Sequence, residues 1–396
     1  WLKASYRVGF NSFTDRRLNV IAAGPAILPL GEIIKDDIYR QEVDGLFNLN
    51  ITKDLSEKFT LNANIGHNVN SRITDRQSVL GTGIITFGIH DIDNTSTQVT
   101  NGGTFSERRL IGVYAEATLG YNDYLFLNLA GRRDYSSTLP KENRAYNYPA
   151  ASLSAIVTEM LNLKSSVLSM GKLRLSAAKV GNDADPYLTQ TVFNTNPPLG
   201  NGNLGTPFTL GNRTLNVLSL GDQIGNAKLK PEFTTEFEAG AEVQLFGGRV
   251  SADVAVYNRR TNNQIVNVTT APSTGFTSII SDLGEIENKG VEAAATFIPL
   301  RLSNGLTWSM THTYTRNRSL VKDMGDLDEV YIGGFTGLGL VHREGLPFGQ
   351  ILGTDYLRDP ETNMPLINGE SGLLIDNPED QIIGDPNPDF QWTMGN

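Results

Sequence analysis

Cysteine is absent from this sequence of 396 residues, and histidine is rare. Without cysteine, the chain has no disulfide framework, no thiolate metal site and no cysteine nucleophile. The four histidines are scattered and form neither an H-x-x-x-H nor an H-E-x-x-H pattern, so we expect no transition-metal site. Basic residues are outnumbered, 33 against 43 acidic residues, which argues against a nucleic-acid partner because nucleic-acid-binding surfaces are basic.

Long apolar runs are missing as well. No segment approaches the roughly 18 to 20 apolar residues that a membrane-spanning helix needs, which excludes a helical membrane protein. No G-x-S-x-G nucleophile elbow is present. Residues 200–205 spell G-x-G-x-x-G, but they follow Pro197-Pro198 instead of a strand, so we interpret them as a loop and not as a dinucleotide site. The sequence therefore predicts neither an enzyme nor a cofactor.

What the sequence does contain is an alternation with a period of two. In residues 59–66 every second residue is apolar, and the residues between are small and polar. Residues 236–245 and 250–256 alternate in the same way, and Gly247 and Gly248 between them provide the positive φ of a tight hairpin turn. Because successive side chains of a strand point to opposite faces, each of these segments has one apolar face and one polar face.

Twelve segments are predicted to be strands, and the connections between them alternate in length. Those at 11–39, 71–107, 182–232, 259–288 and 319–388 are long, whereas those at 53–57, 122, 159–170, 247–248 and 300–305 are short, and 135–146 is intermediate. The strands are predicted to begin near Trp1, Arg40, Lys58, Arg108, Asp123, Asn147, Gly171, Phe233, Arg249, Lys289, Leu306 and Asp389.

This alternation is typical of outer-membrane barrels, which have short turns on the periplasmic side and long loops on the outer side. In lipid every backbone N–H and C=O must be paired, so such a sheet has to close. The predicted fold class is therefore all-β, an antiparallel transmembrane β-barrel with short periplasmic turns and long extracellular loops. The polar residues that we predict to face the lumen are Asn62, Asn64, Glu236, Glu238, Glu242 and Asp253. Aromatic residues near strand ends are candidates for interfacial girdles: Trp1, Tyr6, Tyr114, Tyr121, Tyr124, Tyr257, Trp308, Tyr314 and Trp392.

Seven short motifs, in order along the chain, resemble those of the SusC/RagA-like TonB-linked outer-membrane receptors. Residues 132–137 resemble the R-x-D-G-S-S segment, with Tyr135 where glycine is typical, and residues 288–292 spell N-K-G-V-E. The other five matches are at 148–153, 173–182, 229–236, 344–349 and 383–390. Each match is weak alone, but seven in the family's order are specific.

The resemblance implies a longer functional protein. Members of this family have an N-terminal plug domain and a barrel of about 22 strands. Residues 1–396 are then part of the receptor's β-barrel domain, and the plug and the last strands lie outside this sequence.

The resemblance also implies a function, which is active import across the outer membrane of a Gram-negative bacterium. Energy would reach the plug through TonB, and a SusD-like lipoprotein would cover the extracellular loops and deliver a glycan or a peptide. The candidate solute-binding residues are aromatic residues of the long loops: Tyr187, Phe193, Phe208, Phe276, Tyr331, Phe335 and Tyr356. The alternatives are a passive porin or a structural barrel subunit of an outer-membrane assembly. A soluble carbohydrate-binding β-sandwich would not explain why all the long connections fall at one end.

Many relatives carry a calcium-loop-like segment before the last motif. In this chain the segment is residues 359–364, and Met364 stands at the sixth position, where a calcium loop needs glycine for its sharp turn. We therefore interpret this segment and the nearby Asp376, Glu379 and Asp380 as a solvated acidic loop and predict no metal site.

Overall fold

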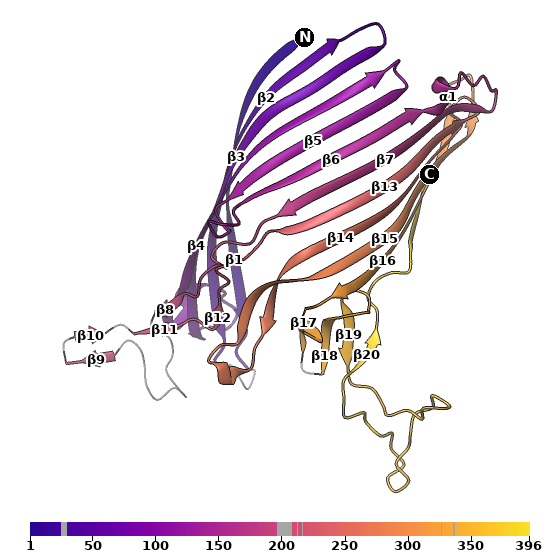
Figure 1. The fold of residues 1–396 in the computed structure, drawn as a ribbon. Coiled ribbons are helices and arrows are strands. Elements are labelled where there is room, and N and C mark those ends of the chain that lie inside the picture. Colours follow the sequence, from indigo (N-terminus) through magenta and orange to yellow (C-terminus); the bar gives the residue numbers. More distant parts are fainter. Residues whose placement is uncertain (25–29, 196–207, 212, 216, 326, 336) are drawn as a thin grey trace.

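The computed structural model describes residues 1–396 apart from 25–29, 196–207, 212, 216, 326 and 336. In the described part, thirteen strands form one large curved sheet, and twelve of them pair antiparallel in chain order (Figure 1). The twelve are β1 (Leu2–Ile21), β2 (Glu32–Asp54), β3 (Phe59–Ile84), β4 (Thr95–Tyr121), β5 (Leu125–Ser136), β6 (Ala145–Ile156), β7 (Leu168–Asn182), β13 (Glu232–Leu245), β14 (Val250–Thr269), β15 (Ser278–Arg301), β16 (Thr307–Asp323) and β21 (Gln391–Gly395). The thirteenth, β12 (Gln223–Ile224), pairs with β15 in parallel.

Small elements lie beyond the large sheet. The short strands β8 (Phe193–Thr195) and β11 (Leu218–Leu220) pair with each other, as do β9 (Phe208–Leu210) and β10 (Arg213–Leu215). A separate four-stranded sheet consists of β17 (Glu329–Phe335), β18 (Leu338–Arg343), β19 (Gln350–Gly353) and β20 (Gln381–Gly384). The helical turns are η1 (Ile92–Asn94), α1 (Val157–Met160) and η2 (Pro272–Thr274). None of the helices in the described residues is long and apolar enough to cross a membrane.

The twelve predicted strands are confirmed, but three of the predicted long loops are wrong. Residues 11–39, 71–107 and 259–288 are mostly strand, because β1 to β4, β14 and β15 continue well past the apolar segments. The connection between β1 and β2 shrinks to residues 22–31. Beyond the apolar segment, cross-strand ion pairs such as Arg76–Asp36 (2.9 Å) replace the alternation on which the prediction relied. The backbone ladder needs no apolar period, so it extends where the sequence signal stops.

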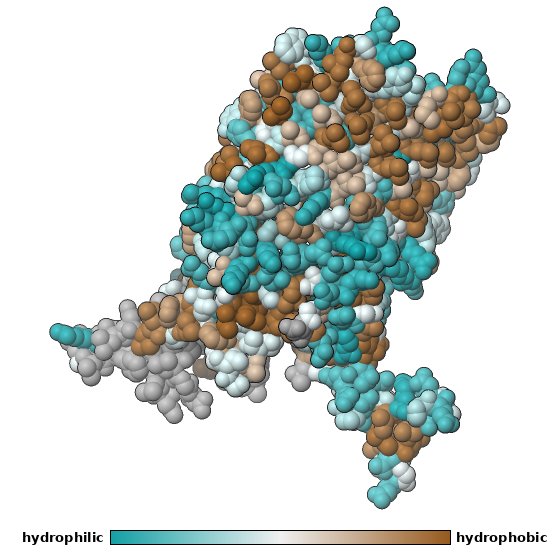
Figure 2. Space-filling model, viewed as in Figure 1, coloured by the Kyte–Doolittle hydropathy of each residue, from teal (hydrophilic) through white to brown (hydrophobic). Residues whose placement is uncertain are grey.

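Register pairing gives the large sheet one apolar face. Leu61, Leu119, Leu127, Leu153, Leu175, Ala239, Val256 and Val291 are partners in one row across eight neighbouring strands. These side chains are not packed against another layer: Leu153 is 41% and Leu175 57% exposed. Figure 2 shows apolar residues gathered over the upper, strand-rich part of the molecule and a band of hydrophilic residues across the middle, with smaller apolar areas below that band. A continuous exposed apolar surface of this kind marks a contact with lipid or protein.

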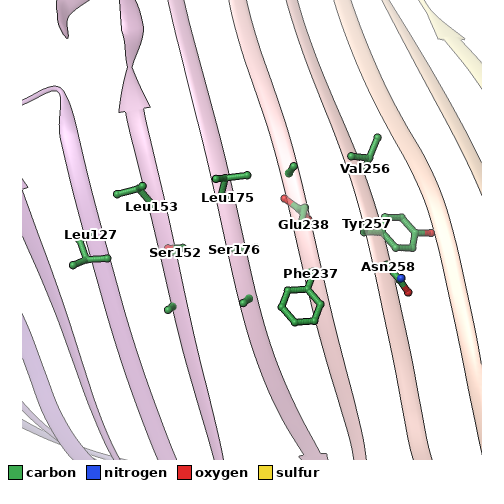
Figure 3. Close-up of a pocket in the computed structure, with 13 residues that line it drawn as sticks. Leu127, Ser152, Leu153, Leu175, Ser176, Phe237, Glu238, Val256, Tyr257 and Asn258 are labelled. Carbon is green, nitrogen blue, oxygen red and sulfur yellow. The ribbon is translucent and has the colours of Figure 1, made fainter.

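A shallow groove of about 630 Å³ lies on this sheet, and Figure 3 shows side chains that line it. Leu127, Leu153, Leu175, Phe237 and Val256, all on the apolar face, are among the residues that line it. Most of the surface that it exposes is apolar, although Ser152 and Glu238 are also in its lining, so it suits hydrocarbon better than a polar solute.

The opposite face of the same strands is polar. Asn62, Thr118, Asn128, Ser152, Ser176, Glu238 and Tyr257 are register partners across seven strands. Glycines make room for the larger side chains of this face: a Cβ at Gly290, in the N-K-G-V-E motif, would overlap the ring of Tyr257. Two predicted girdle residues, Tyr114 and Tyr257, belong to this face, where they donate hydrogen bonds to Asn48 (2.6 Å) and Asn317 (3.2 Å). The girdle interpretation is therefore wrong for these two.

Buried apolar residues are few and lie at the loop end of the sheet. One cluster contains Leu139, Tyr146, Ala184, Leu229 and Ile280. It joins the β5–β6 connection to the long segment between β7 and β13 and to β15. Leucines of the apolar row, such as Leu153 and Leu175, stay exposed, whereas this cluster packs loop residues against Tyr146 of β6 and Ile280 of β15.

Candidate functional site

All six residues predicted to face the lumen lie on the polar face of the large sheet. Asn62 and Glu238 belong to one register row, and Asn64 and Glu236 belong to the next row through Glu116, Ala130, Ala150 and Ala178. Glu242 of β13 is the direct partner of Asp253 of β14. The structure thus brings them together on one surface, and their contact with a solute stays a prediction.

Ion pairs organise this face around Arg174 of β7. Its guanidinium forms a bidentate pair with Asp253, two strands away, with Nη2 2.7 Å from Oδ1. Its Nε also donates to Glu238 at 3.4 Å. The guanidinium passes over Gly240 on the intervening strand, where a Cβ would overlap it. Bidentate arginine–carboxylate pairs fix side-chain geometry more firmly than single contacts.

A second arginine of the polar face neutralises another of the predicted glutamates. Arg259 donates from Nε to Glu236 Oε2 at 2.5 Å. Of the acidic residues predicted for the lumen, three therefore carry arginine partners, and Glu242 has Lys172 as its register partner on β7. The polar face combines carboxylates, guanidinium groups and short amide side chains, which can bind a polar solute by many hydrogen bonds.

The predicted loop aromatics are not gathered into one site. Tyr187 follows β7, Phe193 is in β8, Phe276 is at the tip of the β14–β15 hairpin, Tyr331 and Phe335 are in β17, and Tyr356 lies in the extension after β19. Phe208 is in β9, and its side chain is outside the described part of the chain. Among the described residues, no ring contact joins two of these seven aromatics. Of the six whose side chains are described, Phe335 is the most exposed at 82%. Their role in solute binding stays a prediction.

A buried ionic site at the loop end of the sheet was not predicted from the sequence. Arg108 of β4 donates from Nε to Asp183 Oδ2 at 2.9 Å, and its Nη2 contacts the other carboxylate oxygen. The hydroxyl of Ser136 also donates to this carboxylate, and Thr138 Oγ1 lies 3.3 Å from it. The side chain of Asp183 is 2% exposed, so its charge depends on these partners.

A neighbouring network lies on the same polar side of the sheet. Arg132 donates from Nε to Asp134 (2.7 Å) and to Tyr148 (2.8 Å), and the Tyr148 hydroxyl also donates to Asp134. Two of the motifs that carry the family resemblance, 132–137 and 148–153, therefore meet here, and Ser136 of the first also contacts Asp183, which directly follows the motif 173–182. A signal in the sequence is the place of Asp183, directly after the 173–182 motif and at the start of the predicted long connection 182–232.

Outside the large sheet, one histidine is buried. His342 of β18 is 6% exposed, its Nδ1 accepts the backbone N–H of Gly349 at 3.2 Å, and its ring centroid lies 3.8 Å from that of Phe348. Burial lowers the pKa of His342 below its ordinary value, because the charged form loses hydration. Burial in the four-stranded sheet therefore favours the neutral form of His342.

Within the described residues, no group of three or more acidic or histidine side chains is arranged to hold a metal ion. In the segment that replaces the calcium loop, Asp359 Oδ1 accepts the backbone N–H groups of Glu361 (3.0 Å) and Thr362 (2.7 Å). These hydrogen bonds lower the pKa of Asp359. The G-x-G-x-x-G segment at 200–205 lies outside the described residues.

Comparison with known families identifies this arrangement of strands. The TonB dependent receptor-like β-barrel family matches residues 1–364. This chain belongs to that family. The resemblance to SusC/RagA-like receptors and the predicted barrel fold class are both confirmed.

Individual relatives support the same family assignment. The TonB-dependent receptor P26 of Formosa agariphila is 28% identical over 331 residues, which is 78% of this chain and 32% of the relative. The TonB-dependent receptor SusC of Bacteroides thetaiotaomicron is 27% identical over 217 residues, which is 53% of this chain and 21% of SusC. This chain thus spans about a third or less of the length of these relatives.

Among solved structures, the RagAB peptide transporter has a similar fold. It superposes with a TM-score of 0.77 at 17% sequence identity, covering 99% of this chain and 44% of the transporter chain. The RagAB peptide importer in its open-open state gives a TM-score of 0.73 at 18% identity. At these identities the likeness concerns the fold.

Proposed function

We propose that this chain is the barrel part of an active importer in the outer membrane of a Gram-negative bacterium. The observation that carries the proposal is the separation of the two faces of one sheet. The exposed apolar row from Leu61 to Val291 suits contact with lipid, and the adjacent row on the opposite face, from Asn62 to Glu238, suits an aqueous interior. Family membership supports an energised barrel rather than an open pore, because the family is that of TonB-dependent receptors.

We further propose that the solute is an oligosaccharide or a peptide. A SusD-like lipoprotein would cover the extracellular loops, and TonB would act through a plug domain. The names of the relatives support this choice, since one is SusC and another is a peptide transporter. The exposed aromatic side chains of β8 and β17 offer flat surfaces of the kind on which sugars and peptide side chains stack. The chain supplies binding and passage, and we propose no catalytic step for it.

The test is uptake by cells that carry the complete protein in their own membrane. Labelled oligosaccharide and labelled peptide mixtures are supplied to wild-type cells, cells lacking this gene and cells lacking TonB. We expect uptake of one solute class to require both genes. Uptake that needs this gene but persists without TonB would contradict active import and favour the passive porin.

Extraction of the protein in mild detergent, followed by mass spectrometry of the intact complex, tests the partner. We expect one lipoprotein bound to a chain longer than this 396-residue sequence. A barrel without a companion, from cells that import normally, would contradict the proposed lid.

A further inference from the structure

A positively charged hollow lies on the outward side of the sheet, where β4 and β5 leave the apolar surface. It has a volume of about 450 Å³, and its lining includes Arg109, Lys141 and Arg144 together with Ile111 and Tyr135. We call it the rim hollow. Arg109, Ile111 and Tyr135 belong to the exposed apolar face and not to the polar face, because they alternate with buried or half-buried neighbours along β4 and β5. Among the described residues that line the hollow, none is acidic.

The rim hollow is a built structure and not a chance group of surface cations. The Arg109 N–H donates to Ser137 Oγ at 2.9 Å, and the Ser137 N–H donates to the Arg109 carbonyl at 2.9 Å. Leu139 anchors the same connection in the buried cluster with Tyr146 and Leu229. The loop that carries Lys141 and Arg144 is therefore fixed to the sheet at two points.

An apolar groove adjoins the rim hollow on the same strands. It has a volume of about 720 Å³, and Phe47, Ile65 and Val113 are in its lining. Val113 and Ile111 are successive outward residues of β4, so the groove and the hollow form one continuous surface. Arg133, which also lines the groove, lies 5.3 Å from the ring centroid of Tyr135 and places a fourth cation between the two.

The position along the strand matches the level of lipid head groups. The hairpin between β4 and β5 carries Tyr121 and Tyr124, whose rings lie 5.6 Å apart, and marks the periplasmic edge of the apolar surface. Ile111 is ten residues from Tyr121, about 34 Å along a strand and about 26 Å in height at a tilt of about 40°. That height equals the roughly 25 Å apolar band of outer-membrane barrels, so Arg109 lies just beyond it.

We propose that the rim hollow binds the phosphate groups of a phosphorylated glycolipid of the outer leaflet, whose acyl chains lie along the adjoining apolar groove. The surface is amphipathic in the same order as such a lipid: cations at head-group level, then aliphatic and aromatic side chains toward the membrane centre. Arg109 has one acidic partner, Glu107 at 2.7 Å, and keeps 68% of its side chain exposed, so the guanidinium retains free donors for phosphate. The inference rests on the proposed outer-membrane location, and it adds a lipid site to the outside of the barrel.

The experiment measures binding of diphosphoryl lipid A to the purified full-length protein in detergent, by intact-complex mass spectrometry. The test variant is Arg109→Gln, Lys141→Gln and Arg144→Gln together. The matched control neutralises three exposed cations at the opposite end of the strands: Lys164→Gln, Arg249→Gln and Arg301→Gln. Each cation near a membrane surface contributes about 1 kcal/mol, a factor of about five, so we expect the rim variant to bind about 100-fold more weakly. We expect the control to bind like the wild type.

Three results would overturn the proposal. They are equal affinity of the rim variant and the wild type, equal affinity for dephosphorylated lipid A, and complete displacement by millimolar inorganic phosphate, which would make this a free-phosphate site. A change in oligomeric state of the rim variant without a change in lipid affinity would assign the surface to a protein contact instead. Because binding is measured on purified protein, failure here is distinct from failure of the uptake test.

Discussion

Replacing Arg108 by glutamine is expected to release the segment that follows β7 from the sheet. Arg108→Gln removes the cation that faces the buried carboxylate of Asp183 and leaves two hydroxyl partners, Ser136 and Thr138. Breaking a buried pair by removing one partner costs about 3–5 kcal/mol, and the remaining hydroxyl groups favour the lower end, about 3 kcal/mol. That loss corresponds to about a hundredfold increase in local opening.

Replacing the other partner of the ion pair, Asp183, is expected to destabilise the segment by a smaller free energy. Asp183→Asn leaves an unpaired arginine, but the Arg108 side chain is 25% exposed and reaches water, whereas the Asp183 side chain is 2% exposed and does not. We therefore expect about 1.5–2 kcal/mol for Asp183→Asn, the lower part of the range of about 1.5–3 kcal/mol for a lost hydrogen bond to a charged group. The asymmetry between the two variants follows from burial and not from the ion pair itself.

Hydrogen exchange of residues 183–195 in the full-length protein measures this opening directly. The control is Arg72→Gln, which breaks an ion pair with Glu42 of similar length, 2.9 Å, between side chains 56% and 37% exposed. Exposed ion pairs contribute about 0–1 kcal/mol to stability, so hydrogen exchange of the residues around Arg72 should change little in this control variant. Unchanged exchange at 183–195 in Arg108→Gln, or a larger effect from Asp183→Asn, would refute the reasoning.

Three further predictions concern the faces of the sheet and the small sheet beyond it. Leu175→Lys is expected to lower membrane insertion by about 2–4 kcal/mol, while Ser176→Lys on the polar face inserts normally, and assembly into vesicles checks this. Gly290→Val is expected to destabilise the barrel by about 1–3 kcal/mol because of the overlapping tyrosine, whereas Gly131→Val, with open space around it, should not; heat-dependent gel mobility compares the two. Because the pKa of His342 is lowered in the folded state, the unfolded chain takes up the proton first. The stability of the β17–β20 sheet is then full above about pH 7 and falls as the pH drops through about 6.5. Hydrogen exchange between pH 7.5 and 5.5 tests this last expectation, and a pH dependence that persists in His342→Gln would contradict it.

The period-two alternation determined the existence of the strands and the division of their side chains between two faces. Asn62, Asn64, Glu236, Glu238, Glu242 and Asp253 could all be assigned to one face, because side-chain direction in a strand depends only on the parity of the residue number. The same reasoning ended where the apolar residues ended, so the outer parts of β1 to β4 were predicted as loops. Backbone pairing continues there without an apolar signal.

Only the tertiary structure decided which polar residues meet. Arg108 and Asp183 are 75 residues apart, and Arg174 and Asp253 are 79 apart. Nothing in either local sequence specifies these partners, because they depend on register across several strands. The rim hollow could also be located only from the tertiary structure, because its lining combines residues of β4 with residues of the connection after β5. Alternation along one strand is a local property of the chain, whereas charge pairing across strands depends on the register between neighbouring strands.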